Sequence, residues 1–281
     1  MGFPKPTLSH KDFLKIRDFI YEKTGMFFDN QKLDFLEKRV FDRMKAVKAE
    51  TPFDYLFHIK FGETAQYELQ NFIETITTNE TYMFREFEQL EVFANHCLPE
   101  IVNHKREQRN PELRLWSAGS STGEEAYTLA IILRECLDDL KNWKISIYAT
   151  DIDTNVLKHL QRGIYSERSV KEVPTEYFNR HLKKTFGGYM VVPETKSLVT
   201  PIHLNLTDYQ GMRKIKNIDF VFCRNCLIYF DDASRKAVVD TFYECMNKNG
   251  YIFLGHSESV GRITDCFTSR NLGNFLVYYK R

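Results

Sequence analysis

The sequence lacks three features that would each point to a simple class of protein. It has no run of about 18 apolar residues, so no membrane-spanning helix is expected and no direct membrane insertion. It has only 6 cysteines in 281 residues, too few for a disulfide scaffold. Its 39 Lys and Arg barely exceed its 38 Asp and Glu, whereas a nucleic-acid-binding surface needs a large basic excess. A local basic patch remains compatible with this balance.

What the sequence does have is enough apolar material for a large core. Apolar residues make up 43% of it, including 23 Phe and 15 Tyr, which excludes a disordered, collagenous or coiled-coil protein. Its length allows one large domain with a smaller one attached. The first residues, Met1–Pro6, lead into a charged stretch rather than an apolar signal core. We therefore expect a cytoplasmic protein, and a monomer by default.

The hydrophobic period divides the chain into two parts. From Ser9 to about Ile76 apolar residues recur at helical spacing, with Gly25 as a C-cap and Thr51-Pro52 opening a further helix, which predicts an all-helical domain over 1–76. A helical run from Asn79 to about Asn103 is expected to lie in a linker over 77–110. The remainder, 111–281, alternates strands and helices.

Strand–helix–strand alternation predicts a parallel sheet with right-handed crossovers, and thus an α/β fold. A β-hairpin insertion is expected over 183–200, with Tyr189–Val192 and Ser197–Thr200 as its arms, and an antiparallel hairpin turns at Asn271–Asn274 near the end of the chain. The strands of the main sheet are expected at 113–118, 145–149, 202–206, 218–222 and 251–254.

The first candidate site is the turn Ser117–Glu125, which joins a strand to a helix and is rich in Gly and Ser. Such a turn lets backbone approach a ligand at the carboxyl end of the strand. Ser121 to Glu124 and Thr122 to Glu125 both have capping-box spacing. The turn is not the dinucleotide fingerprint, and its acidic pair would repel a pyrophosphate, so a ligand with a positive centre suits it better. A plain capped helix is the alternative.

Two further candidates follow later strands. Asp151 ends the second strand, where an acidic side chain can accept from ribose hydroxyls, although Asp153 next to it also reads as a helix N-cap. Cys223-Arg224-Asn225 ends a buried strand on the ligand side of such a sheet. Cys223 and Cys226 form a C-x-x-C, but no second pair stands at zinc spacing and the position is wrong for a thioredoxin-like unit, so we expect neither metal nor redox chemistry.

Taken together, these motifs resemble one family, the chemotaxis receptor methyltransferases. The resemblance spans nearly the whole chain in order, and it rests on Asn79–Glu86, Trp116–Glu125, Ala149–Asp153, Gly163–Tyr165, Asn205-Leu206, Phe222–Asn225 with Ile228–Phe230, and Gly255–Glu258. It implies a class I methyltransferase fold, that is, a Rossmann-like doubly wound sheet with an N-terminal all-helical domain and a small antiparallel β insertion. It also implies methyl transfer from S-adenosylmethionine to receptor glutamates, with S-adenosylhomocysteine as product.

The resemblance also assigns roles to individual residues. Arg85 and Tyr229 would orient the incoming carboxylate beside the transferred methyl group; for Tyr229 the alternative is ordinary packing beside Phe230. The residues implied to bind the cofactor are Asn79, Thr81, Arg85, Gly119, Glu125 at the methionine end, Asp151 at the ribose, and Asn205, Leu206, Cys223, Arg224 and Asn225 near the adenine. His256 could be read as a base, but we favour a structural role for it.

The chemistry of the residues fits this assignment. A glutamate carboxylate has a pKa near 4.3, so it is ionised at neutral pH and needs no general base. The sequence offers no convincing base dyad or nucleophile–His pair. The rivals are a methyltransferase acting on a small molecule or nucleic acid and a non-catalytic adaptor. Balanced charge and the absence of an Asn/Asp-Pro-Pro-Tyr motif after the fourth strand argue against nucleic acid, and the intact Arg85, Glu125, Asp151 and Tyr229 argue against an adaptor.

Substrate docking is expected elsewhere, on the basic helix that spans residues 38–48. Its cations are Lys38, Arg39, Arg43, Lys45 and Lys48, against only Asp42. Such a face suits a Glu-rich receptor helix, although charge runs are usually just solvated; the resemblance favours docking by Lys38, Arg39 and Arg43. Some members of the family also bind a receptor C-terminal peptide through the β insertion. The loop over 183–189 looks short for that, and we expect no dependence on such a tether.

Overall fold

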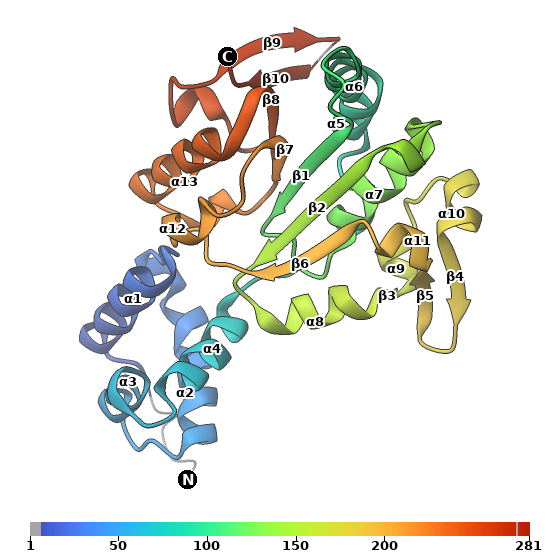
Figure 1. Ribbon diagram of the computed structural model, residues 1–281. Coiled ribbons are helices and arrows are strands. Elements are labelled where there is room, and N and C mark those ends of the chain that lie inside the picture. Colours follow the sequence, from blue (N-terminus) through green and yellow to red (C-terminus); the bar gives the residue numbers. More distant parts are fainter. Residues whose placement is uncertain (1–6, 274) are drawn as a thin grey trace. The chain divides into compact units, whose positions relative to one another are not determined.

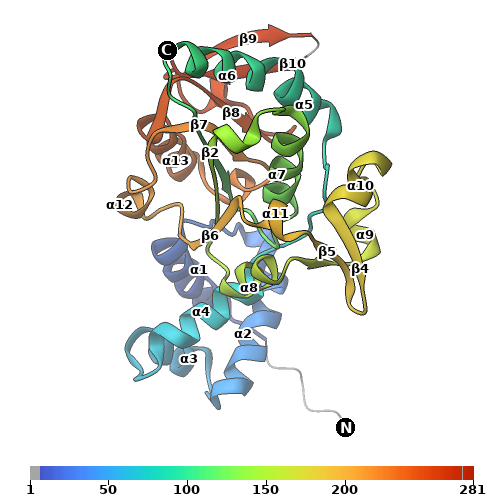
Figure 2. The same ribbon diagram turned by 45° about the vertical axis from the view of Figure 1, so that its right-hand side comes forward.

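The computed structural model describes residues 7–273 and 275–281 (Figures 1 and 2). The stretch Met1–Pro6, and Asn274 in the expected C-terminal hairpin turn, lie outside the described residues. The chain forms two compact units. One holds the chain up to Thr78 together with Tyr229–Asp231, and the other holds Asn79–Ile228 and Asp232–Arg281. Among the described residues no helix combines the length and apolar character needed to cross a bilayer.

The first unit is helical, and its helix ends are specified locally. Its elements are α1 (His10–Thr24), a 3-10 turn (Asn30–Lys32), α2 (Leu33–Val47), α3 (Pro52–Phe61) and α4 (Ala65–Ile76). Gly25 caps α1 in the left-handed conformation at φ 73°, where a residue without a side chain is least strained. Thr51 and Asp54 form a capping box with Pro52 in the first turn of α3. Both predicted helix signals are confirmed.

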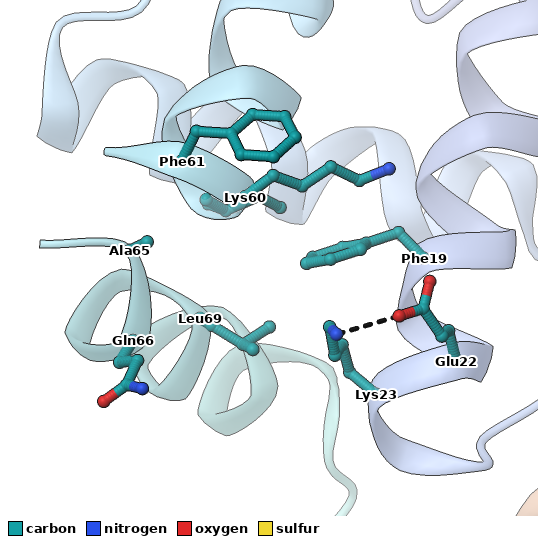
Figure 3. A pocket seen from close by; sticks show the side chains of 9 residues that line it. Phe19, Glu22, Lys23, Lys60, Phe61, Ala65, Gln66 and Leu69 are labelled. Atoms are coloured by element: carbon teal, nitrogen blue, oxygen red, sulfur yellow. Dashed lines mark hydrogen bonds and ion pairs between the residues drawn. The ribbon is translucent and has the colours of Figure 1, made fainter. Parts of the chain in front are cut away.

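The helical unit has a small core, and a groove lies beside it. Phe13, Ile16 and Ile20 of α1 are at most 1% exposed, as their spacing predicts. A groove of about 520 Å³ lies between α1, α3 and α4. Figure 3 shows Lys23 and Lys60 near the Phe19 ring in it, with the two ammonium nitrogens 5.7 and 5.0 Å from the ring centre. No residue of the basic helix α2 lines this groove.

The second unit is built on a seven-stranded sheet in the order β6-β2-β1-β7-β8-β10-β9. The first five strands in that order are parallel, and β10 runs antiparallel to both β8 and β9. The strands are β1 (Glu112–Ala118), β2 (Lys144–Asp151), β6 (Val199–His203), β7 (Ile218–Cys223), β8 (Met246–Leu254), β9 (Thr268–Leu272) and β10 (Phe275–Tyr279). The α/β class and the C-terminal antiparallel pair are confirmed.

Helices cover both faces of this sheet. Phe93 packs edge-on against Phe220 and Phe222 on one face, whereas Trp116 packs against Phe242 of α13 on the other. The helical segments are α5 (Phe87–Val92), a π-helical stretch (Phe93–Cys97), α6 (Leu98–Glu107), α7 (Glu124–Cys136), α8 (Thr154–Arg162), α9 (Glu167–Val170), α10 (Thr175–His181), α11 (Pro193–Lys196), α12 (Tyr209–Met212) and α13 (Asp232–Cys245), with 3-10 turns at Leu140–Asn142, Leu227–Tyr229 and Val260–Arg262.

The small antiparallel sheet differs from the expected hairpin. Its order is β3-β5-β4, formed by β3 (Ile164–Tyr165), β4 (Leu182–Thr185) and β5 (Gly188–Val191). The hairpin arms are therefore β4 and β5, and the expected pairing of 189–192 with 197–200 is wrong. Pro193 begins the helical turn α11, and Val199 then starts β6, which pairs with β2 in the main sheet. At Gly188, with φ 131°, a Cβ would lie 2.2 Å from the Tyr165 carbonyl oxygen, so the close approach of β5 to β3 requires glycine at this position.

Candidate active site

The candidate site residues of the second unit gather at the carboxyl ends of β1, β2, β6 and β7. These strands are neighbours and run parallel, so the loops that follow them meet at one edge of the sheet (Figure 1). The expected strand at 202–206 lies three residues too late, because β6 ends at His203. Asn205 ends the extended chain: its side-chain oxygen accepts from the N–H and hydroxyl of Thr207 at 3.0 and 2.9 Å. Asn205 and the buried Leu206 thus stand in the loop.

The turn after β1 is held by close contact with the loop after β7. Gly119 has φ 68°, and a Cβ on it would lie 2.6 Å from Cys226 Sγ. The predicted capping boxes are wrong: the N-cap of α7 is Gly123 at φ 95°, with no side-chain cap. The hydroxyl of Thr122 instead donates to Glu124 at 2.5 Å. A left-handed glycine at the cap aims the two preceding hydroxyls away from the helix N–H groups, which is why the spacing misleads.

One guanidinium lies between two carboxylates at this edge. Arg224 is 4% exposed, with Glu86 at 3.2 Å and Glu125 at 3.5 Å, and it also donates to the Arg85 carbonyl. Ser117 Oγ donates to Glu125 at 2.7 Å, while burial raises the pKa of the Glu125 carboxyl. When both carboxyls are ionised, Arg224, Glu86 and Glu125 together carry one excess negative charge, and the Arg85 guanidinium is a further cation that acts on Glu125. A cationic ligand would relieve that excess, and an anionic one would be repelled.

Two aspartates organise the edge after β2. Asp151 is buried and accepts from the Ser121 N–H at 2.8 Å and from the Asp153 N–H at 2.9 Å, while burial raises the pKa of its carboxyl. Asp153 caps α8, as expected, through bonds from the N–H groups of the first turn. Its second oxygen accepts from the Asn79 side-chain amide at 3.0 Å. The structure therefore brings Asn79, Asp151 and the Gly/Ser turn together.

The segment Asn79–Glu86 is not the helix that its apolar spacing predicts. Phe84 and Glu86 have φ of 59° and 56°, both in the left-handed region. The N–H of Met83 donates to the Ser169 carbonyl at 2.8 Å, and that of Phe84 donates to Thr128 Oγ1 at 3.0 Å. These tertiary bonds replace the i−4 helical bonds and turn the chain before α5. Backbone held in such regions costs roughly 1–3 kcal/mol each and clusters at functional sites.

Arg85 and Thr81 lie within this irregular segment. Arg85 is partly buried, and its guanidinium donates to the Glu80 carbonyl at 3.3 Å. Its own carbonyl accepts from Arg224, so the backbone of the Arg85 segment and the β7 loop are directly joined. Thr81 is also partly buried. Cys223 is buried at the end of β7, where a hydrogen bond with Cys226 and burial raise the pKa of its thiol, which stays protonated at neutral pH.

Tyr229 and the basic helix belong to the helical unit. The Tyr229 carbonyl accepts from the Phe27 N–H at 2.9 Å, and Phe230 forms a β-bridge with Met26. On α2, the Arg43 guanidinium donates two hydrogen bonds, of 2.9 and 2.5 Å, to the Glu68 carboxylate. Glu68 is 2% exposed. The Arg39 guanidinium lies 3.6 Å from the centre of the Phe35 ring and donates to the Thr75 carbonyl. Lys38 is exposed.

Comparison with known proteins agrees with this architecture. Residues 11–77 match the family model for the CheR methyltransferase all-alpha domain, and residues 79–275 match the model for the CheR methyltransferase SAM binding domain. The chain belongs to the CheR methyltransferase family. It is 38% identical to chemotaxis protein methyltransferase 2 of Vibrio cholerae, covering 97% of this chain and 94% of that protein. The chemotaxis protein methyltransferases of Borreliella burgdorferi and Escherichia coli are each 31% identical, covering 90% and 94% of this chain and 89% of each relative.

S-adenosylmethionine is the methyl donor of this CheR methyltransferase. The site residues fit a polar, positively charged ligand. Several of the buried side-chain atoms that lack a hydrogen-bond partner within the described chain lie at this edge, namely Ser120 Oγ, Arg224 Nε and Asn225 Oδ1. Buried polar atoms are rarely left unpaired, so those that face a ligand site are suited to pair with the ligand. The excess negative charge around Arg224 matches a sulfonium and an ammonium group.

Sequence reasoning missed two glutamates of this CheR methyltransferase. Glu86 stands next to Arg85 in a motif that was recognised, yet only the structure places it against Arg224. Glu258 belongs to the recognised Gly255–Glu258 motif, but its partners are about thirty residues away along the chain. The indication available in the sequence was that both glutamates are charged residues within these motifs. It could not reveal the pairing, because the contacts join loops from different strands.

Proposed function

We propose that the protein is a glutamate O-methyltransferase that forms methyl esters on the cytoplasmic helices of methyl-accepting chemoreceptors, and so tunes chemotactic adaptation. The observation that carries the proposal is the Arg224 cluster with its excess carboxylate, set beside Arg85 at the ligand edge of a SAM binding domain. The names of the relatives support the chemotactic role. Because the substrate helices lie in the cytoplasm, the proposal places the enzyme there too.

The division of labour among residues follows from charge. When bound, S-adenosylmethionine supplies an electrophilic methyl group on a sulfonium. Glu125 and Asp151 hold the cationic and ribose portions, and the chain at Asn205-Leu206 and Cys223 encloses the adenine. Arg224, which lies 3.5 Å from Glu125, is placed with it at the cationic portion. Arg85 binds the incoming carboxylate and orients it, and the Tyr229 hydroxyl adds a hydrogen bond that fixes its angle. No side chain needs to remove a proton, because the substrate glutamate is already ionised at neutral pH.

Docking is assigned to the helical unit, residues 1–76, through Lys38, Arg39 and Arg43 of α2. The linker over 77–110 adds Asn79, Thr81 and Arg85 to the cofactor site, and 111–281 supplies the rest. Lys38 is exposed, whereas Arg39 and Arg43 already have partners within α2 and α4. Lys38 is therefore the side chain whose loss tests docking without disturbing the unit.

A transfer assay tests the proposal. Purified protein is incubated with S-adenosylmethionine labelled in the methyl group and with cytoplasmic fragments of chemoreceptors, and the products are treated with base. We expect volatile labelled methanol, which reports methyl esters, and no transfer by Arg85→Ala. Label that survives base would indicate a different acceptor atom, such as nitrogen. Tight cofactor binding with no label on any receptor would support the adaptor alternative and contradict the proposal.

A further inference from the structure

The loop between β7 and Tyr229 needs an anchor of its own. After Cys223 the chain leaves the sheet, and Asn225 takes a left-handed conformation at φ 57°. A 3-10 turn follows over Leu227–Tyr229. The backbone N–H groups in such a loop are not paired by a neighbouring strand, and unpaired N–H groups are costly once removed from water. A side chain outside the loop can accept from them and hold the loop in place.

Glu258 is that acceptor. Its Oε2 accepts from the Asn225 N–H at 3.0 Å, and its Oε1 accepts from the Ile228 N–H at 3.1 Å. The same Oε2 also accepts from the Gly255 N–H at 2.8 Å, which ties the carboxylate to the end of β8. One side chain therefore spans the loop from two residues after β7 to the residue before Tyr229. Bonds from N–H groups to a charged acceptor are stronger than neutral ones.

Gly255 makes this arrangement possible. A Cβ at Gly255 would lie 2.9 Å from the Asn225 backbone nitrogen and 2.9 Å from Glu258 Oε2. Any larger residue would therefore push the β8 end away from the loop. His256, by contrast, is an exposed residue of the same motif, and its Nε2 lies 4.0 Å from Glu86. Gly255 and Glu258 thus act together to hold the β7 loop against the end of β8. His256 and Ser257, which lie between them, take no part in this.

We propose that Glu258 is a positioning residue for methyl transfer, which fixes the backbone that carries Tyr229 without touching the reacting atoms. This inference rests on the proposed function and on the role proposed there for Tyr229. Arg224, earlier in the same loop, has its own restraints from Glu86, Glu125 and the Arg85 carbonyl. The Tyr229 carbonyl has its own bond from the Phe27 N–H. Within the loop itself, the Glu258 bond to the Ile228 N–H holds the residue before Tyr229, so loss of the Glu258 bonds loosens this end more than the Arg224 end. Turnover therefore depends on Glu258 more strongly than cofactor affinity does, although Glu258 also bonds the N–H of Asn225.

The decisive variant is Glu258→Gln, which keeps the size of the side chain. An amide has one acceptor oxygen and one donor nitrogen, so it cannot accept from both the Asn225 and the Ile228 N–H groups. Losing one hydrogen bond to a charged acceptor lowers the population of the correctly positioned loop by about tenfold or more. We expect kcat to fall by about that factor, with S-adenosylhomocysteine affinity within about threefold of wild type. Ser257→Ala, an exposed neighbour, is the matched control and should retain wild-type kcat.

A double-variant cycle separates positioning from a general structural defect. If Glu258 acts through Tyr229, Glu258→Gln should cost little further activity in a Tyr229→Phe background, because the hydroxyl that it positions is already gone. Full additivity of the two losses, or a kcat for Glu258→Gln equal to that of Ser257→Ala, would overturn the inference. Failure of the proposed function has a different signature: the wild-type protein itself would form no base-labile ester.

Discussion

A methyl group on Gly119 would meet Cys226 Sγ at 2.6 Å and would also sit at a φ of 68°. Gly273 has nearly the same backbone conformation, with φ 60°, but nothing lies within 4 Å of its Cβ position. The left-handed conformation costs a residue with a side chain about 1–2 kcal/mol. The two glycines therefore allow the conformational cost to be separated from the cost of crowding the ligand edge.

We predict that Gly119→Ala destabilises the protein more than Gly273→Ala and weakens S-adenosylhomocysteine binding about tenfold or more. Gly273→Ala should lose only about 1–2 kcal/mol of unfolding free energy and keep its affinity. Urea denaturation and titration calorimetry measure the two effects. Equal losses of stability and unchanged affinity in both variants would show that the contact between the β1 turn and the β7 loop is unimportant.

Glu124 provides a pH test at the same turn. It is 3% exposed, and burial raises the pKa of its carboxyl. A carboxyl with a raised pKa binds more protons in the folded than in the unfolded state, so its contribution to stability falls as pH rises above its unfolded pKa of about 4.3. We expect Glu124→Gln to gain stability relative to wild type as pH is raised from about 4.5, with the gain levelling off above the folded pKa. A difference that stays constant with pH would contradict this.

At the scale of elements, one buried carboxylate joins three helices. Glu68 of α4 accepts from Arg43 of α2 and, at 3.0 Å, from the Tyr55 hydroxyl of α3. Glu68 is 2% exposed. Removing the cation from such a cluster leaves a buried charge uncompensated, which typically costs about 3–5 kcal/mol. The expected docking role of Arg43 is therefore combined with a structural one.

We predict that Arg43→Ala lowers the free energy of unfolding of the helical unit by about 3 kcal/mol, so that the unit unfolds at a lower urea concentration. Lys38→Ala should leave the stability unchanged. Lys38→Ala should still weaken receptor binding and reduce its salt dependence, because an exposed cation steers association. Circular dichroism and binding at two salt concentrations measure both effects. Restored stability in Arg43→Ala combined with Glu68→Gln would confirm the buried charge as the cause; no effect of Lys38→Ala on receptor binding would count against docking through α2.

The small sheet carries a further prediction. Its hairpin turns within Phe186-Gly187, and β4, with Lys183 and Lys184, is an edge strand. Lysines on an edge strand discourage the addition of another strand. We expect no saturable binding of receptor C-terminal peptides at micromolar concentration, as measured by calorimetry. A clear isotherm that maps to residues 183–200 would contradict this.

The sequence predicted the elements best where their cause is local. The apolar spacing of Phe13, Ile16 and Ile20 and the cap at Gly25 are set by neighbours within a few residues, and both were right. The segment Asn79–Glu86 was predicted wrongly, because its N–H groups bond to Ser169 and Thr128 rather than within the segment. The role of Glu258 could not be predicted for the same reason: its partners Asn225 and Ile228 become neighbours only after the sheet has formed.

At the scale of the whole molecule, the near-zero net charge is an average over unlike parts. The chain totals 39 basic and 38 acidic residues. Residues 38–48 nevertheless hold five cations against one carboxylate, whereas Glu86, Glu125 and Asp151 concentrate acid at the ligand edge. The proposed function uses both signs separately, one to attract receptor helices and the other to hold a cationic donor. Composition alone could exclude a general nucleic-acid binder, but the placement of each sign required the motifs and then the structure.

Ligand binding should distinguish the two units. A ligand that binds only the folded state stabilises the part that contacts it. We predict that S-adenosylhomocysteine slows amide hydrogen exchange in the turn at 119–123 and in the loop at 223–228, and leaves α1 and α3 unchanged. Mass spectrometry of exchanged peptides measures this. Uniform protection of all helices of the first unit would contradict the assignment of the cofactor site to the second.

The tripeptide Tyr229–Asp231 has a consequence for how these enzymes can be recombined. It is encoded deep within the methyltransferase part, yet it belongs to the helical unit, where Phe230 bridges Met26 and the Tyr229 carbonyl accepts from Phe27. The chain thus passes between the units three times, after Thr78, after Ile228 and after Asp231. A chimera that exchanges only residues 1–78 between two relatives would pair a foreign helical unit with a resident tripeptide. The natural module for such grafts is discontinuous, and an exchange has to carry both pieces together.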